Sequence, residues 1–583
     1  MLFLFCRIIH EQYNFGRSRA EERSGCLQMK RFIESVLAAT CAFSLLFGTG
    51  ITRAEGDAAD AAMQSIRPEA IRADMRFLSD DLLEGRGTGS RGYDIAAKYM
   101  AAEFEGMGLE GAGEKGTYFQ SVPLRSAHLN EAKTTVTLVR GGKEETLVFR
   151  KDFIAGGDPS RADTSVEAPV VYVGAGVTAP EQGYDDYKGI DVKGKIVAVI
   201  FGAPPAFESS VHAHYSSSEV KAENAVAHGA VGLIRLDDPA LERLYSFQKR
   251  VRDLAFPGMW WLDEKGQPND YYPELKGRAT FSMAATKKIF EGSPHTADEV
   301  FAAAKAGKVL SFELPVTAKI HDVTTLGNLR GTNVVAKLPG SDPALARECV
   351  VLTAHLDHLG IGTPVKGDKI YNGALDNASG SAILLEIARS FARMNPRPRR
   401  SIVFLAVTGE EKGLLGSDFF AHYPSVEKKA VVANVNMDED LMLWPLKDIV
   451  AYGAEHSSLG SVVNEAAKRM NLTISPDPAP EEVIFIRSDQ YSFVKQGVPA
   501  VFPVAGFKSE DPKVNPEAIF KNWEQTRYHQ PQDDMNQPGL DFMAAASYAR
   551  FVFLCGLTIA QKTERPTWNA GDFFGEHYAK NSR

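Results

Sequence analysis

Ala354-His355-Leu356-Asp357-His358 places two imidazoles and a carboxylate at the end of an apolar run, residues 349–354. Two further apolar runs follow at residues 402–408 and, more weakly, at residues 431–436. Short continuous runs rich in β-branched residues are typical of strands in the centre of a sheet covered on both faces. The sequence therefore predicts an α/β fold in which a mixed central sheet has helices on both faces.

A helix is predicted between the first two of these strands. Asn377 can cap its N-terminus, and Pro396 lies beyond its C-terminus. Four apolar residues between them recur at the spacing of one helix face, namely Ile383, Leu384, Ile387 and Phe391. The chain is therefore expected to pass from the first strand to the second through this helix.

Acidic and imidazole side chains follow each predicted strand, and a further histidine comes later. In chain order they are His355, Asp376, Glu410, Glu411, Asp438 and His529. Ligands of open α/β sheets bind beyond the carboxyl ends of the strands, so these side chains are expected to converge. Imidazole and carboxylate ligands without cysteine are typical of a catalytic rather than a structural zinc site.

Two histidines and three carboxylates are more ligands than one zinc ion needs. If Asp376 bridges two ions, His355 and Asp438 can complete the first site. Glu411 and His529 can then complete the second. Three ligand carboxylates and a bridging hydroxide would balance the charge of two Zn(II), so the sequence predicts a two-zinc centre.

Glu410 remains as a carboxylate that is free to act as a general base, since a two-metal site can lower the pKa of bound water to about 7. Asp357 and Asp533 are expected to support the ligands, because metal-bound imidazoles usually donate their other N–H to a carboxylate or carbonyl. For His358, support of a ligand, pocket lining and simple packing are equally open. The sequence thus separates predicted ligands, base and supporting groups.

These residues resemble the co-catalytic di-zinc exopeptidases of the bacterial leucyl aminopeptidase and glutamate carboxypeptidase type, in the version with an inserted protease-associated domain. The resemblance covers nearly the whole mature chain. It implies that Glu410 is the general base, that Asp357 orients a histidine ligand, and that Tyr528 stabilises the tetrahedral oxyanion. It also implies the five zinc ligands predicted above: His355, Asp376, Glu411, Asp438 and His529.

The segment Arg487-Ser488-Asp489 resembles a substrate-side loop of the same family, so these three residues are predicted to bind substrate. Many relatives continue this loop with histidine, whereas this chain has Gln490. A histidine role at that position is therefore in doubt, while the metal centre is unaffected.

Residues 148–313 are expected to form the inserted domain. Strand-like runs at residues 168–174, 194–200 and 229–235 surround a helical segment at residues 219–228, which indicates a small α/β unit. Its motif His212-Ala-His214 lies in a serine-rich segment and is expected to be an exposed, unliganded pair. The catalytic domain would then comprise residues 55–147 and 314–565, followed by a tail at residues 566–583.

The N-terminal region carries the pattern of a secretory signal. Met29 opens a short basic segment, an apolar stretch covers residues 36–51, and cleavage is expected after Ala54. The alternative is a membrane anchor, but the stretch is shorter than the ~20 residues of a spanning helix. We therefore expect a periplasmic or secreted protein, with Met29 as its start and without stable membrane insertion after cleavage.

The formal net charge of the chain is −9 at pH 7, and the segment that would be removed is basic. An acidic mature chain argues against nucleic acid or an anionic membrane as partner. Only Cys349 and Cys555 remain after cleavage, so no disulfide framework is expected, although one bridge is open. Asp541, Arg550 and Gln561 argue against a membrane span in the closing helix at residues 540–562.

The combined pattern predicts a zinc aminopeptidase that removes N-terminal residues from peptides. Two alternatives stay open. A glutamate-carboxypeptidase-like exopeptidase or dipeptidase would need cationic side chains for a terminal carboxylate, and Arg487 is one candidate. A receptor or binding protein on an inactive peptidase scaffold would lack ligands, whereas none of the five is missing here.

Overall fold

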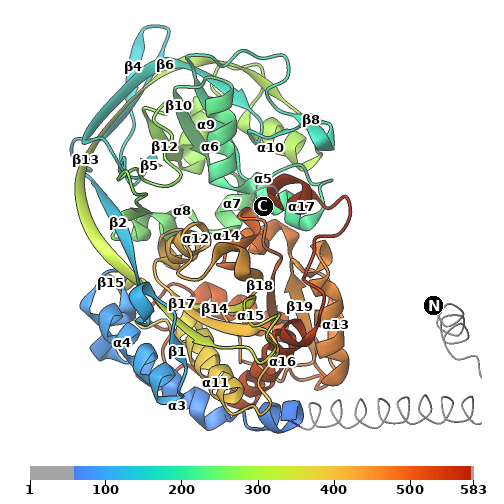
Figure 1. The fold of residues 1–583 in the computed structure, drawn as a ribbon. Helices are drawn as coiled ribbons and strands as arrows, with labels where there is room; N and C mark the ends of the chain where they lie inside the picture. The colour runs from blue at the N-terminus through green and yellow to red at the C-terminus, as the bar shows by residue number, and fades with distance from the viewer. Residues whose placement is uncertain (1–57, 580–583) are drawn as a thin grey trace, which may run out of the picture. The chain divides into compact units, whose positions relative to one another are not determined.

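The three predicted strands lie side by side in the central sheet of the computed structural model, which describes residues 58–579 (Figure 1). The predicted signal peptide and the start at Met29 fall outside these residues. β14 (Cys349–His355) pairs in parallel with β17 (Ser401–Val407) and with β18 (Val431–Asn436). Every residue of the three strands is buried, as continuous apolar runs predict.

The sheet is mixed, which confirms the predicted fold class. β21 (Ala500–Ala505) continues it in parallel beyond β18. On the other side β13 (Ser311–Leu338) pairs antiparallel with β17 and with β2 (Phe119–Leu129). β1 (Glu110–Gly111) adds a short antiparallel edge to β13. The parallel strands are thus central, and antiparallel strands flank them.

Helices cover both faces of this sheet. On one face, Phe404 of β17 meets Phe391 and Phe104, whose rings lie 6.1 Å from it. On the other face, Val403 and Leu405 pack with Phe420 and Phe493. The first face carries α3 (Pro68–Leu78), α4 (Arg91–Gly106), α11 (Gly380–Ala392), α13 (Leu459–Arg469) and α16 (Phe542–Gln561), and the second carries α12 (Leu415–His422) and α14 (Gln490–Lys495).

The predicted helix between the first two strands is α11. Asn377 accepts a hydrogen bond from the Gly380 N–H at 2.9 Å, although the residue just before the helix is Ser379. A turn at Ala374–Ser379 precedes α11, and this turn carries Asp376. The helix ends at Ala392, before Pro396, as predicted.

Among residues 58–579, α16 alone is long and apolar enough to cross a membrane. Most of its side chains are buried in the core, including Cys555, so α16 is a core helix here. Cys555 and Cys349 are both free thiols. The disulfide that the sequence left open is therefore absent between them.

The inserted domain is built on a second sheet. β6 (Asp163–Val173), β9 (Ile196–Val199), β10 (Gly232–Leu236) and β12 (Arg278–Phe281) form its parallel part. α6 (Ser218–Ala227) connects β9 to β10 through the helical segment expected there. The alternation predicted for this region is therefore present.

One long strand joins the two sheets. The first half of β13 pairs with β6 and with β3 (Thr135–Arg140), and its second half lies in the central sheet. β3 also pairs with β4 (Lys143–Thr146). We therefore place β3 and β4 with the inserted domain, before the boundary at residue 148 that the sequence suggests.

The inserted domain contacts the helical face that carries α14. His214 in α5 (Ser209–Ser216) is buried, and its Nδ1 lies 2.7 Å from Tyr491 Oη of α14. The expectation of an exposed His212–His214 pair was therefore wrong, because His214 is buried and His212 is half-buried, with its Nε2 accepting the Ala203 N–H. The polar residues around His214 in the sequence indicated exposure, and its contact with Tyr491 could not be predicted because Tyr491 is far away in the chain. Burial lowers the pKa of His214 to about 3, so its imidazole is neutral.

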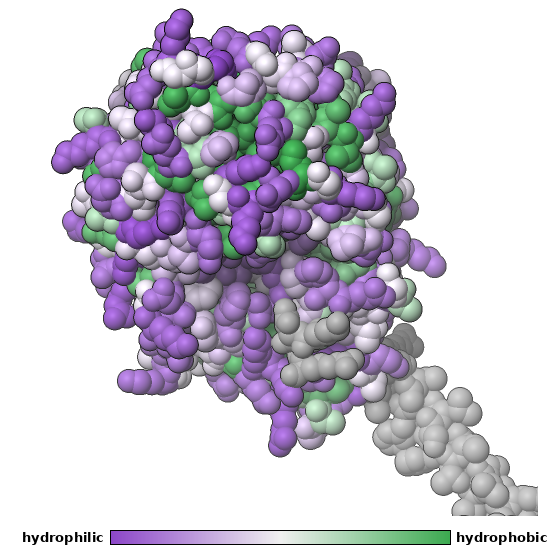
Figure 2. Space-filling view, turned by 90° about the horizontal axis from the view of Figure 1, so that it is seen from above, coloured by the Kyte–Doolittle hydropathy of each residue, from purple (hydrophilic) through white to green (hydrophobic). Residues whose placement is uncertain are grey.

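Within the inserted domain, two short helices follow β10, namely α7 (Pro239–Leu244) and α8 (Phe247–Asp253). β11 (Gly258–Trp261) follows and pairs with β2 of the central sheet. In Figure 1, α7 and α8 lie between the sheet of the inserted domain and α12 and α14, and Tyr245 and Asp253 of this segment line the cavity described below. Seen from the side of the inserted domain, the surface is mostly hydrophilic, with apolar side chains in smaller groups (Figure 2).

Candidate metal centre and adjoining cavity

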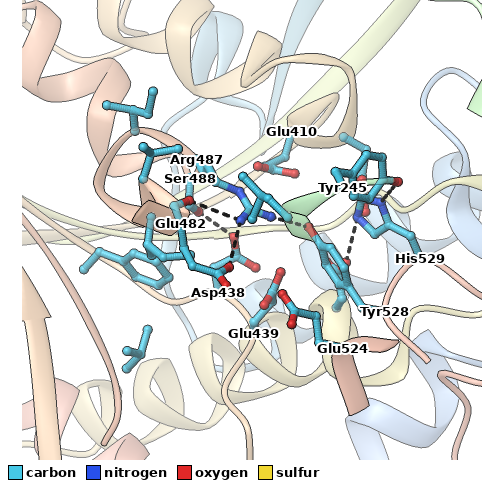
Figure 3. A pocket seen from close by; sticks show the side chains of 18 of the residues that line it. Tyr245, Glu410, Asp438, Glu439, Glu482, Arg487, Ser488, Glu524, Tyr528 and His529 are labelled. Atoms are coloured by element: carbon cyan, nitrogen blue, oxygen red, sulfur yellow. Dashed lines mark hydrogen bonds and ion pairs between the residues drawn. The ribbon is translucent and has the colours of Figure 1, made fainter. Parts of the chain in front are cut away.

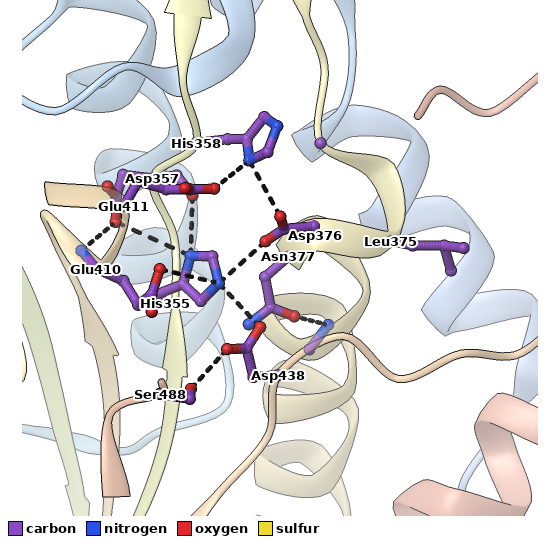
Figure 4. Close-up of polar contacts among 12 residues, drawn as sticks. His355, Asp357, His358, Leu375, Asp376, Asn377, Glu410, Glu411, Asp438 and Ser488 are labelled. Atoms are coloured by element: carbon purple, nitrogen blue, oxygen red, sulfur yellow. Dashed lines mark hydrogen bonds and ion pairs between the residues drawn. The ribbon is translucent and has the colours of Figure 1, made fainter. Parts of the chain in front are cut away.

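The predicted ligands meet at the carboxyl ends of the three central strands (Figure 4). His355 ends β14, the Glu410-Glu411 pair opens the short turn after β17, and Asp438 follows β18. His529 arrives from the segment after α15 (Pro516–Thr526). Parallel strands bring their ends to one edge, so residues far apart in sequence share one site.

Two groups of donor atoms share Asp376. His355 Nε2 lies 3.3 Å from Asp376 Oδ1 and 3.0 Å from Asp438 Oδ1. His529 Nε2 lies 3.3 Å from Asp376 Oδ2 and 3.2 Å from Glu411 Oε2. Each oxygen of Asp376 therefore faces one group, which is the arrangement of a bridging carboxylate.

The spacing of these atoms fits zinc. In a tetrahedral site with bonds of about 2.0 to 2.1 Å, two ligand atoms lie about 3.3 Å apart. Asp376 Oδ2, Glu411 Oε1 and His358 Nδ1 are buried, and His358 Nδ1 lies only 2.5 Å from Glu411 Oε1. Ligand atoms of these three residues all lie within 4.8 Å of one another, so the group could hold a cation.

The carboxylates of the second group are held in the charged form that a metal ligand needs. Burial acts to raise both pKa values, and the Glu411 charge acts to raise that of Asp376 as well. Charge and hydrogen bonds from His358 and His529 outweigh this, so the pKa of Glu411 lies well below its usual range. The pKa of Asp376 is lowered as well, with a further hydrogen bond to His355.

His358 belongs to this second group, although the sequence left its role open. It is fully buried, and its Nδ1 lies 2.5 Å from Glu411 Oε1 and 3.7 Å from Asp376 Oδ2. The sequence did offer one indication of this role. His358 follows Asp357 directly, at the same strand end that carries the predicted ligand His355. His358 is therefore an additional candidate donor, not a packing residue.

Glu410 points to the other side of its turn from Glu411. Its Oε2 lies 4.0 Å from His355 Nε2, and the residue lines the adjoining cavity. Its backbone N–H donates to Asp357 Oδ1 at 3.1 Å. Glu410 thus has its carboxylate beside His355 of the first donor group and at the wall of the cavity, a position suited to a base.

Asp357 contacts the predicted histidine ligand His355 through its backbone carbonyl rather than its carboxylate. His355 Nδ1 lies 3.0 Å from the backbone carbonyl of Asp357, whereas the Asp357 carboxylate is 4.0 Å from that nitrogen. The carboxylate instead accepts hydrogen bonds from the Glu410 N–H and from Thr88 Oγ1 at 2.8 Å. Asp357 therefore orients His355 through its carbonyl and fixes the Glu410 turn through its side chain.

Asp533 contacts backbone, and the expectation that it would support an imidazole was wrong. Its carboxylate accepts the N–H groups of Leu375 and Asp376, each at 3.0 Å, and the Gln537 side chain at 2.7 Å. Burial raises its pKa to about 6. Asp533 therefore holds the turn that presents Asp376.

Arg86, which sequence analysis did not single out, ties the ligand-bearing loops together. It is fully buried, and its guanidinium donates to the carbonyls of Leu356, Asn372 and Gly373 and to that of Leu78. Burial lowers its pKa to about 10, so it remains charged. No local pattern indicates this role, since its partners lie up to 287 positions away.

A cavity of about 700 Å³ opens beside the metal centre (Figure 3). Glu410, Asp438, Tyr528 and His529 line its inner end. Apolar side chains form much of the remaining wall, including Ile484, Ile486, Phe502, Phe520 and Trp523. A peptide side chain can therefore be buried next to the reactive groups.

Two of the three predicted substrate residues line this cavity, Arg487 and Ser488. Ser488 Oγ donates to Asp438 Oδ2 at 2.5 Å, so it also holds a predicted ligand. Asp489 is fully buried and is not among the described residues of the lining. Gln490 forms hydrogen bonds with the Phe485 carbonyl and the Asn436 side chain, so it holds these two segments together.

Comparison with known proteins identifies both parts of the chain. Residues 333–552 match the model of peptidase family M28, and residues 166–257 match the PA domain model. The chain carries a family M28 peptidase domain with an inserted PA domain. This confirms the resemblance drawn from the ligand motifs. All predicted ligands of the M28 domain, including Asp376 and His529, lie within the matched residues.

Among curated relatives of this M28 chain, the rat aminopeptidase NAALADL1 is 27% identical over 319 residues, which is 47% of this chain and 38% of the relative. Leupeptin-inactivating enzyme 1 of Streptomyces exfoliatus is 31% identical over 123 residues, 21% of this chain and 25% of the relative. The chain thus spans well under half of each relative.

Among solved structures, the aminopeptidase from Aneurinibacillus sp. strain AM-1 superposes with a TM-score of 0.50 at 19% identity. The match covers 87% of this chain and 97% of that one. It supports the fold of the M28 chain over both the catalytic and the inserted parts.

Proposed function

We propose that the protein is a zinc-dependent aminopeptidase that removes N-terminal residues from peptides. The observation that carries the proposal is the pair of donor groups sharing Asp376, with Glu410 beside them at the inner end of a cavity. The names of the matched relatives point to the same activity. The signal pattern at residues 29–54 suggests a periplasmic or secreted enzyme.

Two zinc ions would be held by the two groups, with Asp376 shared between them. When bound, they would polarise the substrate carbonyl and lower the pKa of a water molecule. His355 and Asp438 complete the first group, and Glu411 and His529 the second. His358 is an additional donor beside Glu411.

Glu410 is placed to transfer the proton. Its carboxylate accepts a proton from the attacking water and then delivers that proton to the leaving amine. One residue can therefore serve as both base and acid in the reaction. The Asp357 carboxylate fixes the position of the Glu410 turn by accepting the Glu410 backbone N–H at 3.1 Å.

Tyr528 is placed to stabilise the oxyanion. Its Oη accepts a hydrogen bond from Arg487 Nη2 at 3.1 Å, so the phenol proton is available to donate into the cavity. Its ring stacks on His529 with centroids 3.9 Å apart, which fixes its position beside the second group. A preorganised donor of this kind favours the tetrahedral transition state.

The charge of the cavity favours an aminopeptidase over a carboxypeptidase. Away from the metal groups, its charged lining contains the acids Asp253, Glu439, Glu482 and Glu524, against the cations Lys412 and Arg487. Burial raises the pKa of Asp253 and Glu439, and that of Glu482 to about 7. A terminal ammonium would favour the charged form of these acids, whereas a terminal carboxylate would find few cations to pair with. Arg487, the candidate for the alternative, already contacts Tyr528.

Matched dipeptides test the proposal. One has a free amino terminus and the other is N-acetylated, and both are measured before chelation, after chelation and after zinc is restored. Chelation-sensitive cleavage of only the free peptide is the expected result. Cleavage of the acetylated peptide would instead support the carboxypeptidase alternative, and cleavage that persists after complete zinc removal would reject the metal mechanism.

A further inference from the structure

The inserted domain reaches a predicted metal ligand of the M28 domain. Tyr245, between α7 and α8, places its Oη 3.3 Å from His529 Nδ1 (Figure 3). The same Oη donates to Asp253 Oδ2 at 2.7 Å. Tyr245 and Asp253 lie within the PA match, and His529 lies within the M28 match. The contact therefore joins two domains at the site itself.

The hydrogen bonds that link His529, Tyr245 and Asp253 all run in one direction. His529 Nε2 faces Asp376 and Glu411, so it is the nitrogen free to bind a cation. Nδ1 then carries the proton and donates to Tyr245 Oη. Tyr245 in turn donates its own proton to Asp253, so each donor has one acceptor.

We propose that Tyr245 and Asp253 are positioning residues through which the inserted domain orients His529 toward the second metal site. The proposal rests on the metal role of His529 in the proposed function. Partners on the far nitrogen of a ligating histidine fix the ring and raise its basicity, and their loss typically weakens metal binding 10-fold to 100-fold.

Tyr245 is held firmly enough to act in this way. Asp238 caps α7 by accepting the Ala240 N–H at 2.7 Å, and Glu242 accepts the Phe247 N–H at 2.8 Å. Behind them, Arg250 pairs with the fully buried Asp237 at 2.8 Å. The two helices are therefore anchored to the sheet of the inserted domain.

A direct contact also ties this segment to the M28 domain. Lys249 Nζ donates to the carbonyl of Glu524 at 3.3 Å, in the helix that leads to His529. β11, which follows α8, is paired with the central sheet. The distance between Tyr245 and His529 is thus set by contacts on both sides.

The alternative is that Tyr245 serves only as cavity wall. Tyr245→Phe separates the two, because phenylalanine keeps the ring and removes the hydroxyl. Asp253→Ala removes the other end of the chain of groups. Tyr272→Phe is the matched control, since Tyr272 is also in the inserted domain and donates to a carboxylate, that of Glu223, at 3.2 Å.

The experiment measures zinc retained per chain across a graded series of chelator concentrations, with circular dichroism to confirm folding. The full-length variants Tyr245→Phe and Asp253→Ala are expected to bind the zinc of the second group about 10-fold less tightly, and the double variant no worse than either. The Tyr272→Phe variant is expected to match the wild type.

His529→Ala separates this inference from the function on which it rests. If His529→Ala lowers zinc retention and Tyr245→Phe leaves zinc affinity unchanged, the positioning role is overturned while the ligand assignment stands. If His529→Ala retains both zinc ions, the ligand assignment and the positioning role both fail.

Discussion

Glu410 and Glu411 are neighbours in sequence for which we propose different roles, base and metal ligand. Glu411 Oε2 faces His529 at 3.2 Å, whereas Glu410 faces the cavity beside His355. The variant Glu410→Gln is expected to lower kcat by about 10² to 10⁴-fold, because the amide cannot accept the proton. Its zinc content should remain that of the wild type, as measured by metal analysis alongside peptide hydrolysis.

Glu411→Gln is the matched control for this residue. It should lose zinc from the second group, since it removes a charged donor rather than the base. Substantial residual activity in Glu410→Gln would remove Glu410 from its role. Equal zinc loss in both variants would contradict the proposal that Glu411 is a metal ligand and Glu410 is not.

At the scale of elements, Arg86 joins the turn Asp81–Arg86 to the loops after β14 and before the Asp376 turn. Arg86→Ala leaves four buried carbonyls without their donor. At about 1 kcal/mol or more for each group, unfolding should become easier by on the order of 4 kcal/mol.

Urea unfolding measures this loss, and Arg91→Ala is the control because Arg91 is exposed at the start of α4. Exposed substitutions of that kind usually change stability by less than about 0.5 kcal/mol. An equal, small effect of both substitutions would contradict the organising role of Arg86.

The packing of α5 on α14 predicts a dependence on pH. Burial lowers the pKa of His214 to about 3, below the value of about 6.5 in an unfolded chain. The folded state therefore binds fewer protons, and stability is lost as pH falls through 6.5. Between pH 7 and pH 5 this group should cost about 2 kcal/mol.

His214→Gln removes this titration while keeping a polar side chain next to Tyr491. Unfolding of wild type and variant at the two pH values isolates the contribution of His214, because other groups titrate in both. The stability of the variant should fall less on acidification. A pH dependence that is identical in the two proteins would count against a neutral buried His214.

At the scale of the whole molecule, the donor groups join segments that run from β14 to the loop after α15. Zinc should therefore stabilise the fold, by about 4 kcal/mol when free zinc exceeds its dissociation constant 1,000-fold. Chelation is expected to lower the Tm in calorimetry, and added zinc to restore it. The Glu411→Gln variant should show a smaller shift, whereas a wild-type Tm unaffected by chelation would exclude this stabilisation.

The sequence by itself determined the chemistry of the site and the central strands. Apolar runs and the residue types that follow them are local properties, so β14, β17 and β18 could be predicted with the ligand types at their ends. The M28 and PA matches confirmed the family from the same motifs. The division of the ligands between two groups stays a prediction, which the spacing around Asp376 supports, while the structure adds His358 to the second group.

Only the tertiary structure decided which groups support the ligands. Asp357 uses its carbonyl, Asp533 binds backbone, and Tyr245 comes from another domain. Each of these contacts depends on loop conformation or on residues far apart in sequence, as with Tyr245 and His529, which are separated by 284 positions. The type of a side chain determines which groups it can bind, whereas the packing of the whole chain determines which partner it meets.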